Sequence, residues 1–149
     1  MATLVGTERG FINTLGDLMA LDQDAIAAYE AAISRIDDLG LREKLQAFKA
    51  DHDRHVTELR DLLARLGGAP TAGAGLKSML TQGKVAMGAL FGDKAILKAM
   101  KSNEDDTNTA YERALRHKDA DAAAVPVLER GLADERRHRQ WIEETLARL

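Results

Sequence analysis

Six ionisable side chains interrupt rows of apolar residues that repeat at helical spacing. They are Asp22, the pair His52 and His55, Glu104, and the pair Glu135 and His138. Burying such groups without partners costs several kcal/mol each, and carboxylates and imidazoles are the ligands that helical bundles use to bind metal ions. The pattern therefore predicts a metal site between helices, with a donor set suited to iron, manganese or zinc.

The spacing within each pair supports a shared site. His52 and His55 are three residues apart, and so are Glu135 and His138. Residues three apart lie on nearly the same side of a helix, so each pair can reach one point on the axis of a bundle. One carboxylate from each partner helix would enclose that point.

An internal repeat links the two halves of the chain. Asp22 precedes Tyr29 by seven residues, as Glu104 precedes Tyr111. The repeat predicts two related helical hairpins packed together. We expect each tyrosine hydroxyl to bond a carboxylate of the opposite hairpin and so to orient a ligand, and Thr107, one turn from Glu104, to assist.

The elements that must position these residues are four helices. Apolar rows at spacings of three and four predict them over about 7–37, from 41 to 66, from Asp93 onward, and from between 119 and 127 to the end. Residues 37–40 form the predicted first turn, and Gly67 the end of the second helix. Asp93 is the predicted N-cap of the third helix, and Pro126 belongs in or before the first turn of the fourth.

A long connection separates the two predicted hairpins, which cover about 7–67 and 93–149. A stretch of this length, 68–92, is unusual unless it crosses the bundle from end to end, which would make the second and third helices parallel. It is expected to include a short helix. Its apolar part, 76–91, either covers the side of the bundle or forms the contact of a homodimer. The chain 1–149 is interpreted as one domain.

Composition favours an all-α protein and excludes several functions. Of 149 residues, 45% are hydrophobic and only 4% aromatic, and there are two prolines. The net charge of -3 gives no reason to bind nucleic acid or an anionic membrane. Without cysteine there is no disulfide, iron–sulfur cluster or thiolate zinc site. No signal peptide or membrane-spanning segment is visible, so a cytoplasmic protein is expected.

Two motifs carry a family resemblance. The segment 132–138 resembles the fourth-helix Glu-x-x-His motif of the ferritin-like superfamily, and Glu104 with Tyr111 resembles its third-helix glutamate and tyrosine. Asn103-Glu104 and the closing 141–144 resemble uncharacterised rubrerythrin-related bacterial proteins, a domain of unknown function. The resemblance implies a ferritin-like four-helix bundle, iron as the metal, and reaction with dioxygen or peroxide. It implies no cage assembly.

The first half departs from that pattern at two positions. Asp22 stands where the family has a glutamate, and His52 replaces the glutamate of the second-helix Glu-x-x-His motif. Because one imidazole nitrogen binds a single ion, only Glu135 is expected to bridge two ions. Three carboxylates and three neutral histidines carry a charge of -3, whereas two divalent ions carry a charge of +4. One ion, an unequal pair and a full dinuclear centre therefore remain open.

The alternative is a metal-free structural or interaction protein with a degenerate site. Carboxylates next to histidines raise the imidazole pKa, so the same residues could form a buried polar network that fixes the register of the helices. Asp51 is placed on a solvated face, or as a substitute ligand if its helix rotates. His117 requires no special role, and no catalytic residue or organic cofactor is assigned.

Overall fold

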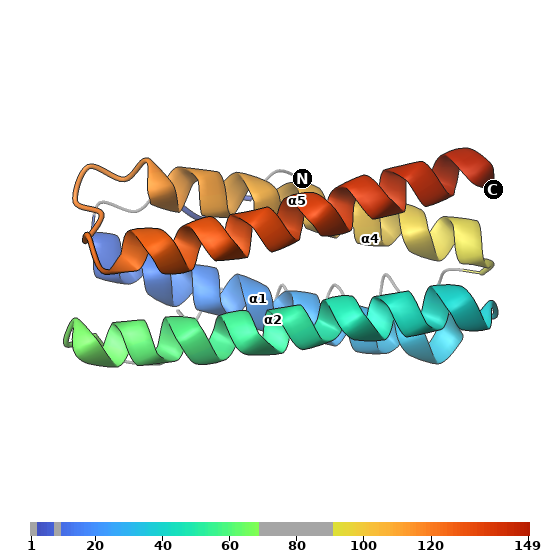
Figure 1. The fold of residues 1–149 in the computed structure, drawn as a ribbon, viewed down its shortest axis with the longest axis horizontal. Coiled ribbons are helices and arrows are strands. Elements are labelled where there is room, and N and C mark those ends of the chain that lie inside the picture. The colour runs from blue at the N-terminus through green and yellow to red at the C-terminus, as the bar shows by residue number, and fades with distance from the viewer. Residues whose placement is uncertain (1–2, 8–9, 69–90) are drawn as a thin grey trace.

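Four amphipathic helices account for the regular structure of the described part of the chain. The computed structural model describes residues 3–7, 10–68 and 91–149. Its helices are α1 (Phe11–Arg35), α2 (Leu39–Arg65), α4 (Asp93–Leu115) and α5 (Ala124–Arg148). The predicted all-α four-helix bundle is confirmed (Figure 1). The predicted short helix, and most of the apolar run 76–91, lie outside the described residues.

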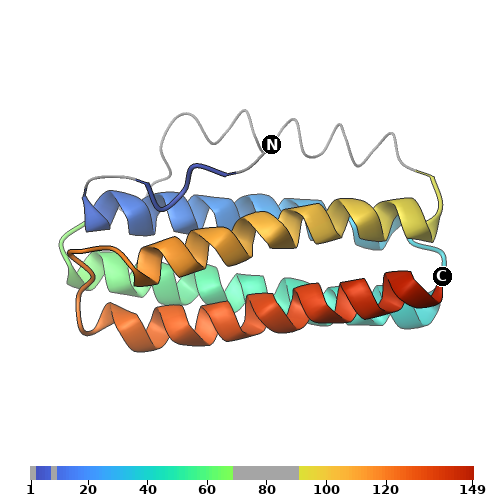
Figure 2. The ribbon, with the colours of Figure 1, turned by 90° about the horizontal axis from the view of Figure 1, so that it is seen from above.

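The helices pack as two antiparallel hairpins. α1 packs along α2 and α4 packs along α5, while α1 also contacts α4 and α2 contacts α5. Figure 2 shows the α1–α4 and α2–α5 pairs side by side. α2 and α4 run in the same direction, as the colours of Figure 1 show, which confirms the prediction that the second and third helices are parallel.

Local capping sets the ends of α2. Asp38 is its N-cap and accepts a hydrogen bond from the backbone N–H of Leu41 at 2.9 Å, so α2 begins two residues earlier than expected. At the other end Gly67 has a φ of 79°, and the N–H of Gly68 donates to the carbonyl of Leu63 at 2.8 Å. This arrangement closes a helix with a left-handed residue, and the predicted glycine end is confirmed.

The prediction for Asp93 was wrong in one respect. The N-cap of α4 is Gly92, whose φ of 86° favours glycine, and Asp93 is the first helical residue. The Asp93 carboxylate instead accepts from the backbone N–H groups of Asp37 at 2.8 Å and Asp38 at 3.0 Å. It therefore ties the α1–α2 turn to the start of α4. In the fourth helix Pro126 lies in the first turn, as predicted.

Two apolar clusters divide the core along its length. One includes Leu18 of α1 and Leu59 of α2, and the other includes Tyr29 of α1 and Phe48 of α2. The six ionisable residues lie between these clusters along their helices. Five of the six have no exposed surface and His55 is only 2% exposed. Apolar packing therefore separates the polar centre from both ends of the bundle.

Candidate metal centre

Each helix contributes to one buried polar centre. Asp22 comes from α1, His52 and His55 from α2, Glu104 from α4, and Glu135 and His138 from α5. The structure brings all six side chains together in two overlapping groups of four. These groups are Asp22, His52, His55 and Glu135, and His52, Glu104, Glu135 and His138. Within each group the ligand atoms lie within 4.8 Å of one another.

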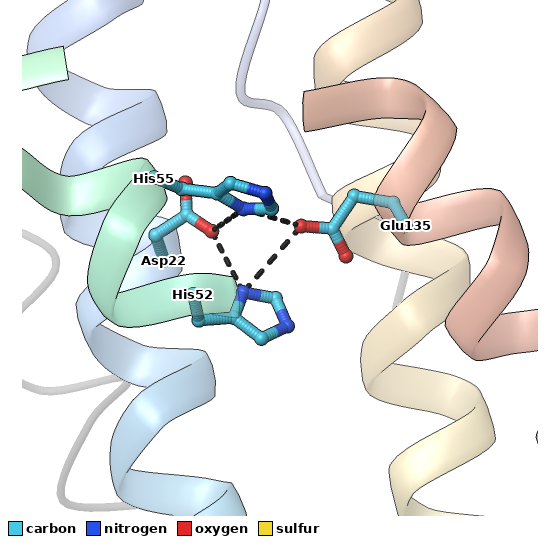
Figure 3. A group of neighbouring side chains, drawn as sticks. All are labelled: Asp22, His52, His55 and Glu135. Carbon is cyan, nitrogen blue, oxygen red and sulfur yellow. Dashed lines mark hydrogen bonds and ion pairs between the residues drawn. The ribbon is translucent and has the colours of Figure 1, made fainter. Parts of the chain in front are cut away.

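The four side chains of the first group point toward one another, as Figure 3 shows. Asp22 Oδ1 lies 2.8 Å from His52 Nδ1 and 3.3 Å from His55 Nδ1. Glu135 Oε1 lies 3.4 Å and 3.2 Å from the same two nitrogens. Ligands at about 2.1 Å from a tetrahedral ion are about 3.4 Å apart. Three of these four distances are close to that value, which is compatible with one ion, and the shortest, between Asp22 and His52, is that of a hydrogen bond.

The second group is looser. Glu104 Oε1 lies 3.4 Å from His52 Nε2 and 3.4 Å from His138 Nδ1. His138 Nδ1 lies 3.8 Å from Glu135 Oε2. His52 and Glu135 thus belong to both groups, and each presents a different atom to each group.

The outer nitrogens of two histidines bind aspartates of the opposite hairpin. His138 Nε2 lies 2.8 Å from Asp51 Oδ2, and His55 Nε2 lies 2.9 Å from Asp134 Oδ2. A carboxylate accepts, so each Nε2–H donates outward and each Nδ1 is directed inward. Metal-binding histidines are commonly oriented by such a carboxylate.

These aspartates were not predicted in this role. The placement of Asp51 on a solvated face was wrong, because its carboxylate reaches across to α5. Asp134 was assigned no role. The signal that could have found them is the internal repeat, since each aspartate immediately precedes the first member of an i, i+3 pair.

Arginines hold the outer aspartates ionised. Arg137 donates to Asp51 at 2.8 Å and to Asp134 at 2.9 Å, and Arg54 pairs with Asp134. Burial raises the pKa of Asp51, but its bonds to His138 and Arg137 outweigh this and hold the pKa well below its ordinary value. For Asp134, the bonds to His55 and Arg137 likewise outweigh burial and lower the pKa to about 2.

The inner carboxylates receive hydroxyl donors, as predicted. Tyr111 donates to Asp22 Oδ2 at 2.6 Å, and Tyr29 donates to Glu104 Oε1. Both bonds join opposite hairpins, which confirms the prediction that each tyrosine binds a carboxylate of the other hairpin. Burial, together with the facing carboxylates, raises the pKa of both phenols, so they remain donors. Thr107 Oγ1 lies 2.9 Å from an oxygen of Glu135 and 3.2 Å from Glu104 Oε2.

Asn108 is a further contributor that sequence reasoning missed. Its Nδ2 donates to the backbone carbonyls of Glu104 at 2.7 Å and Glu135 at 3.0 Å. The side chain therefore links α4 to α5 at the level of two candidate ligands. Its position four residues after Glu104, within a helix, was the available signal.

The pKa values of all three histidines in the metal-free centre are raised. Burial lowers the pKa of the histidines, but facing carboxylates more than offset this, raising the pKa of His55 to about 12 and of His138 to about 9. The pKa of His52 is also raised well above its ordinary value, against burial, by Glu135 and Asp22. Protonated imidazoles therefore face carboxylates when no metal is bound.

Two candidate ligand atoms nevertheless lack a hydrogen-bond partner among the described residues. They are Glu135 Oε1 and His138 Nδ1, and both are fully buried. Burying a polar atom without a partner is costly, and such atoms in native proteins require an explanation. Because both atoms belong to the groups described above, the donor set fits a metal ion.

His117 lies apart from this centre. Its ring packs 5.4 Å from that of Phe11, and its Nδ1 accepts from the backbone N–H of Asp119 at 3.0 Å. These contacts agree with its exclusion from the predicted site.

The two-hairpin architecture and the buried acid–imidazole centre define a ferritin-like four-helix bundle. A solved structure with the same fold is described as "A Dodecameric Thioferritin in the Bacterial Domain, Characterization of the Bacterioferritin-Related Protein from Bacteroides fragilis". It matches with a TM-score of 0.80 at 15% identity, covering 92% of this chain and 84% of that chain.

Residues 10–117 match the family described as "Domain of unknown function (DUF2383)", and the chain belongs to this family. No curated protein matches the chain. Across residues 3–7, 10–68 and 91–149, no helix combines the length and apolar character needed to cross a membrane. The chain thus has the fold of a ferritin-like four-helix bundle, belongs to the DUF2383 family, and carries a buried cluster compatible with metal binding.

Proposed function

We propose that this protein binds one or two first-row transition ions in the bundle core. The proposed ligands are Asp22, His52, His55, Glu104, Glu135 and His138. The observation that carries the proposal is the buried inward-facing Nδ1 of His138, which has no hydrogen-bond partner among the described residues while Nε2 binds Asp51. A metal ion would use that lone pair and also the Oε1 of Glu135, which accepts no hydrogen bond among the described residues.

Iron is the favoured ion, with manganese and zinc as alternatives. The mixed carboxylate and imidazole donors suit all three, and the preference for iron comes from the ferritin-like resemblance. Iron held by these residues in the ferrous state would supply electrons to dioxygen or peroxide, and we propose that reaction for this protein.

The surrounding residues have separate tasks in this proposal. Tyr29 and Tyr111 fix the carboxylates of Glu104 and Asp22, so that the ligands need little rearrangement on binding. The apolar clusters on either side exclude water along the bundle axis. A small oxidant or metal ion would therefore enter from the side of the bundle.

A metal-free structural role is the second candidate, and one observation favours it. Bonds to His52 and His55 outweigh the effect of burial and lower the pKa of Asp22, while His138 and His52 do the same for Glu104. Imidazolium groups can thus balance the carboxylates of Asp22 and Glu104 without an ion, whereas burial and the neighbouring Glu104 raise the pKa of Glu135 against the effect of the histidines. Such a network could fix the register of the helices.

Metal analysis separates the two candidates. We expect protein purified without chelator to contain one or two ions per chain, and chelator-treated protein to bind ferrous, manganous or zinc ions with a rise in Tm. Substoichiometric metal together with no thermal shift in any titration would establish the metal-free alternative.

A matched pair of variants tests the ligand assignment. His138→Ala removes a proposed ligand, whereas His117→Ala removes a histidine outside the centre. We expect the first substitution to weaken binding and the second to leave it unchanged. Equal effects would show that the assignment of His138 is wrong.

The cellular location and the oligomeric state of the protein are also proposals. We expect a cytoplasmic location and a homodimer. Cell fractionation and sedimentation of the purified chain test these two expectations. A monomer, or a larger ring or shell, would exclude the homodimer without affecting the metal proposal.

A further inference from the structure

The ring of His52 is directed at two different groups of ligands. Its Nδ1 lies 2.8 Å from Asp22 Oδ1 and 3.4 Å from Glu135 Oε1. Its Nε2 lies on the other side of the ring, 3.4 Å from Glu104 Oε1. The side chain has no exposed surface, so neither nitrogen can be satisfied by bulk water. Each nitrogen must therefore carry a proton or bind an ion.

His52 differs in this respect from the two other histidines of the centre. His55 and His138 each bind an outer aspartate through Nε2 and present only Nδ1 to the interior. Both nitrogens of His52 face inward-pointing carboxylates, and no outer aspartate binds either one. Its position is thus central, between the two groups of four.

We propose that His52 bridges two metal ions, binding one through Nδ1 and the other through Nε2. This inference rests on the proposed function. Asp22 and His55 would complete the first ion's site, Glu104 and His138 would complete the second, and Glu135 would offer one oxygen to each. The expectation that only Glu135 can bridge assigned a single nitrogen to His52, and the geometry adds the second.

The proton balance follows from the two bonds. Each metal–nitrogen bond uses the lone pair of one ring nitrogen. A neutral ring carries a proton on one of these atoms, and that proton passes to solvent when the second ion binds. His52 then carries one negative charge as an imidazolate.

Charge balance supports this arrangement. Two divalent ions bring four positive charges, and the carboxylates of Asp22, Glu104 and Glu135 supply three negative ones. An imidazolate at His52 supplies the fourth, so the centre is neutral. A net charge in a fully buried site carries a large desolvation penalty, which favours the neutral set.

The bridge determines the separation of the ions. Two metal–nitrogen bonds of about 2 Å, added to the width of the ring, place the ions about 6 Å apart. Ions bridged mainly by carboxylates or a single oxygen are about 3.5–4 Å apart. The two arrangements are therefore distinguishable in a crystal structure with anomalous data at the zinc edge.

Zinc titration of the full chain and its variants tests the proposal. We expect two zinc ions per chain, about 6 Å apart. His55→Gln and His138→Gln should each weaken the binding of one zinc ion. His52→Gln should weaken the binding of both ions by at least about tenfold. The zinc–zinc distance in the unsubstituted protein remains decisive if His52→Gln does not fold.

The possible failures are separable. Two zinc ions about 3.5–4 Å apart, a single zinc ion, or an effect of His52→Gln on one ion only would each overturn the bridge while leaving the proposed metal function in place. Absence of binding by zinc, ferrous and manganous ions would overturn the proposed function itself.

Discussion

The metal-free protein should lose stability as the pH rises from 6.5 to about 9. His138 has an ordinary pKa of 6.5, and in the fold, against the effect of burial, contacts with Asp51 and Glu104 raise it to about 9. The folded state therefore keeps a proton that the unfolded chain releases. The stability from this group is complete below pH 6.5 and is lost as the pH rises through about 9.

The expected magnitude follows from the two pKa values. Each pH unit between them changes the free energy of unfolding by about 1.4 kcal/mol. The loss due to His138 therefore reaches roughly 3 kcal/mol when the pH reaches its folded-state pKa of about 9. His55, with its pKa raised to about 12, adds a similar slope that continues above this window. A loss of roughly 3 kcal/mol is a large fraction of the free energy of unfolding of an ordinary domain.

Urea unfolding of chelator-treated protein, followed by circular dichroism at several pH values, measures this slope. His138→Gln should reduce the slope by about 1.4 kcal/mol per pH unit. A free energy of unfolding that is independent of pH across this range would refute the assignment of protonated, carboxylate-paired imidazoles.

Metal loading should reverse the dependence. Ions bind deprotonated imidazole nitrogens, so their affinity increases with pH over the same range. The stability of metal-saturated protein should therefore hold or increase where that of the metal-free protein falls. Parallel curves with and without metal would contradict the metal proposal.

Three substitutions extend these expectations. A Cβ on Gly131 would lie 2.4 Å from Cε1 of the buried Tyr111 ring, so Gly131→Ala should destabilise the protein by roughly 1–3 kcal/mol in urea unfolding, and an unchanged midpoint would contradict the packing described. Tyr111→Phe should cost roughly 1–2 kcal/mol by the same assay, because it leaves a buried carboxylate of α1 short of a donor. Asp51→Asn should lower metal affinity roughly 10–100-fold in chelator competition through the orientation of His138, with the exposed Asp53→Asn as control.

Much of the fold could be predicted because apolar periodicity is a property of each helix alone. The rows around Leu18, Phe48 and Ile142 are read directly from spacing, and the long connection implied the parallel second and third helices. Capping was less predictable. Gly92 and Asp93 are adjacent and both suit a helix start, and the choice depends on the α1–α2 turn, which Asp93 binds from another part of the chain.

The candidate ligands could be predicted for the same reason, since an ionisable residue in an apolar row must point inward. The orienting groups required information that spacing does not contain. Asp51 is one position from His52 and lies at the edge of the buried stripe. Its carboxylate binds His138 only because α5 lies close enough to α2 for the two side chains to meet. Helix rotation and separation are set by packing of all four helices, so the contact with His138 emerges only in three dimensions.

The replacement of a carboxylate by His52 gives this centre two neutral states. Without metal, three imidazolium groups offset three carboxylates. With two divalent ions, three carboxylates and the proposed imidazolate offset four positive charges. The two states differ by two ions taken up and four protons released, so neither leaves a net charge in the apolar core. Four carboxylates facing two histidines would stay net negative even with both histidines protonated. Three carboxylates facing three imidazolium groups are balanced, so this centre can fold before it binds metal without protonating a carboxylate.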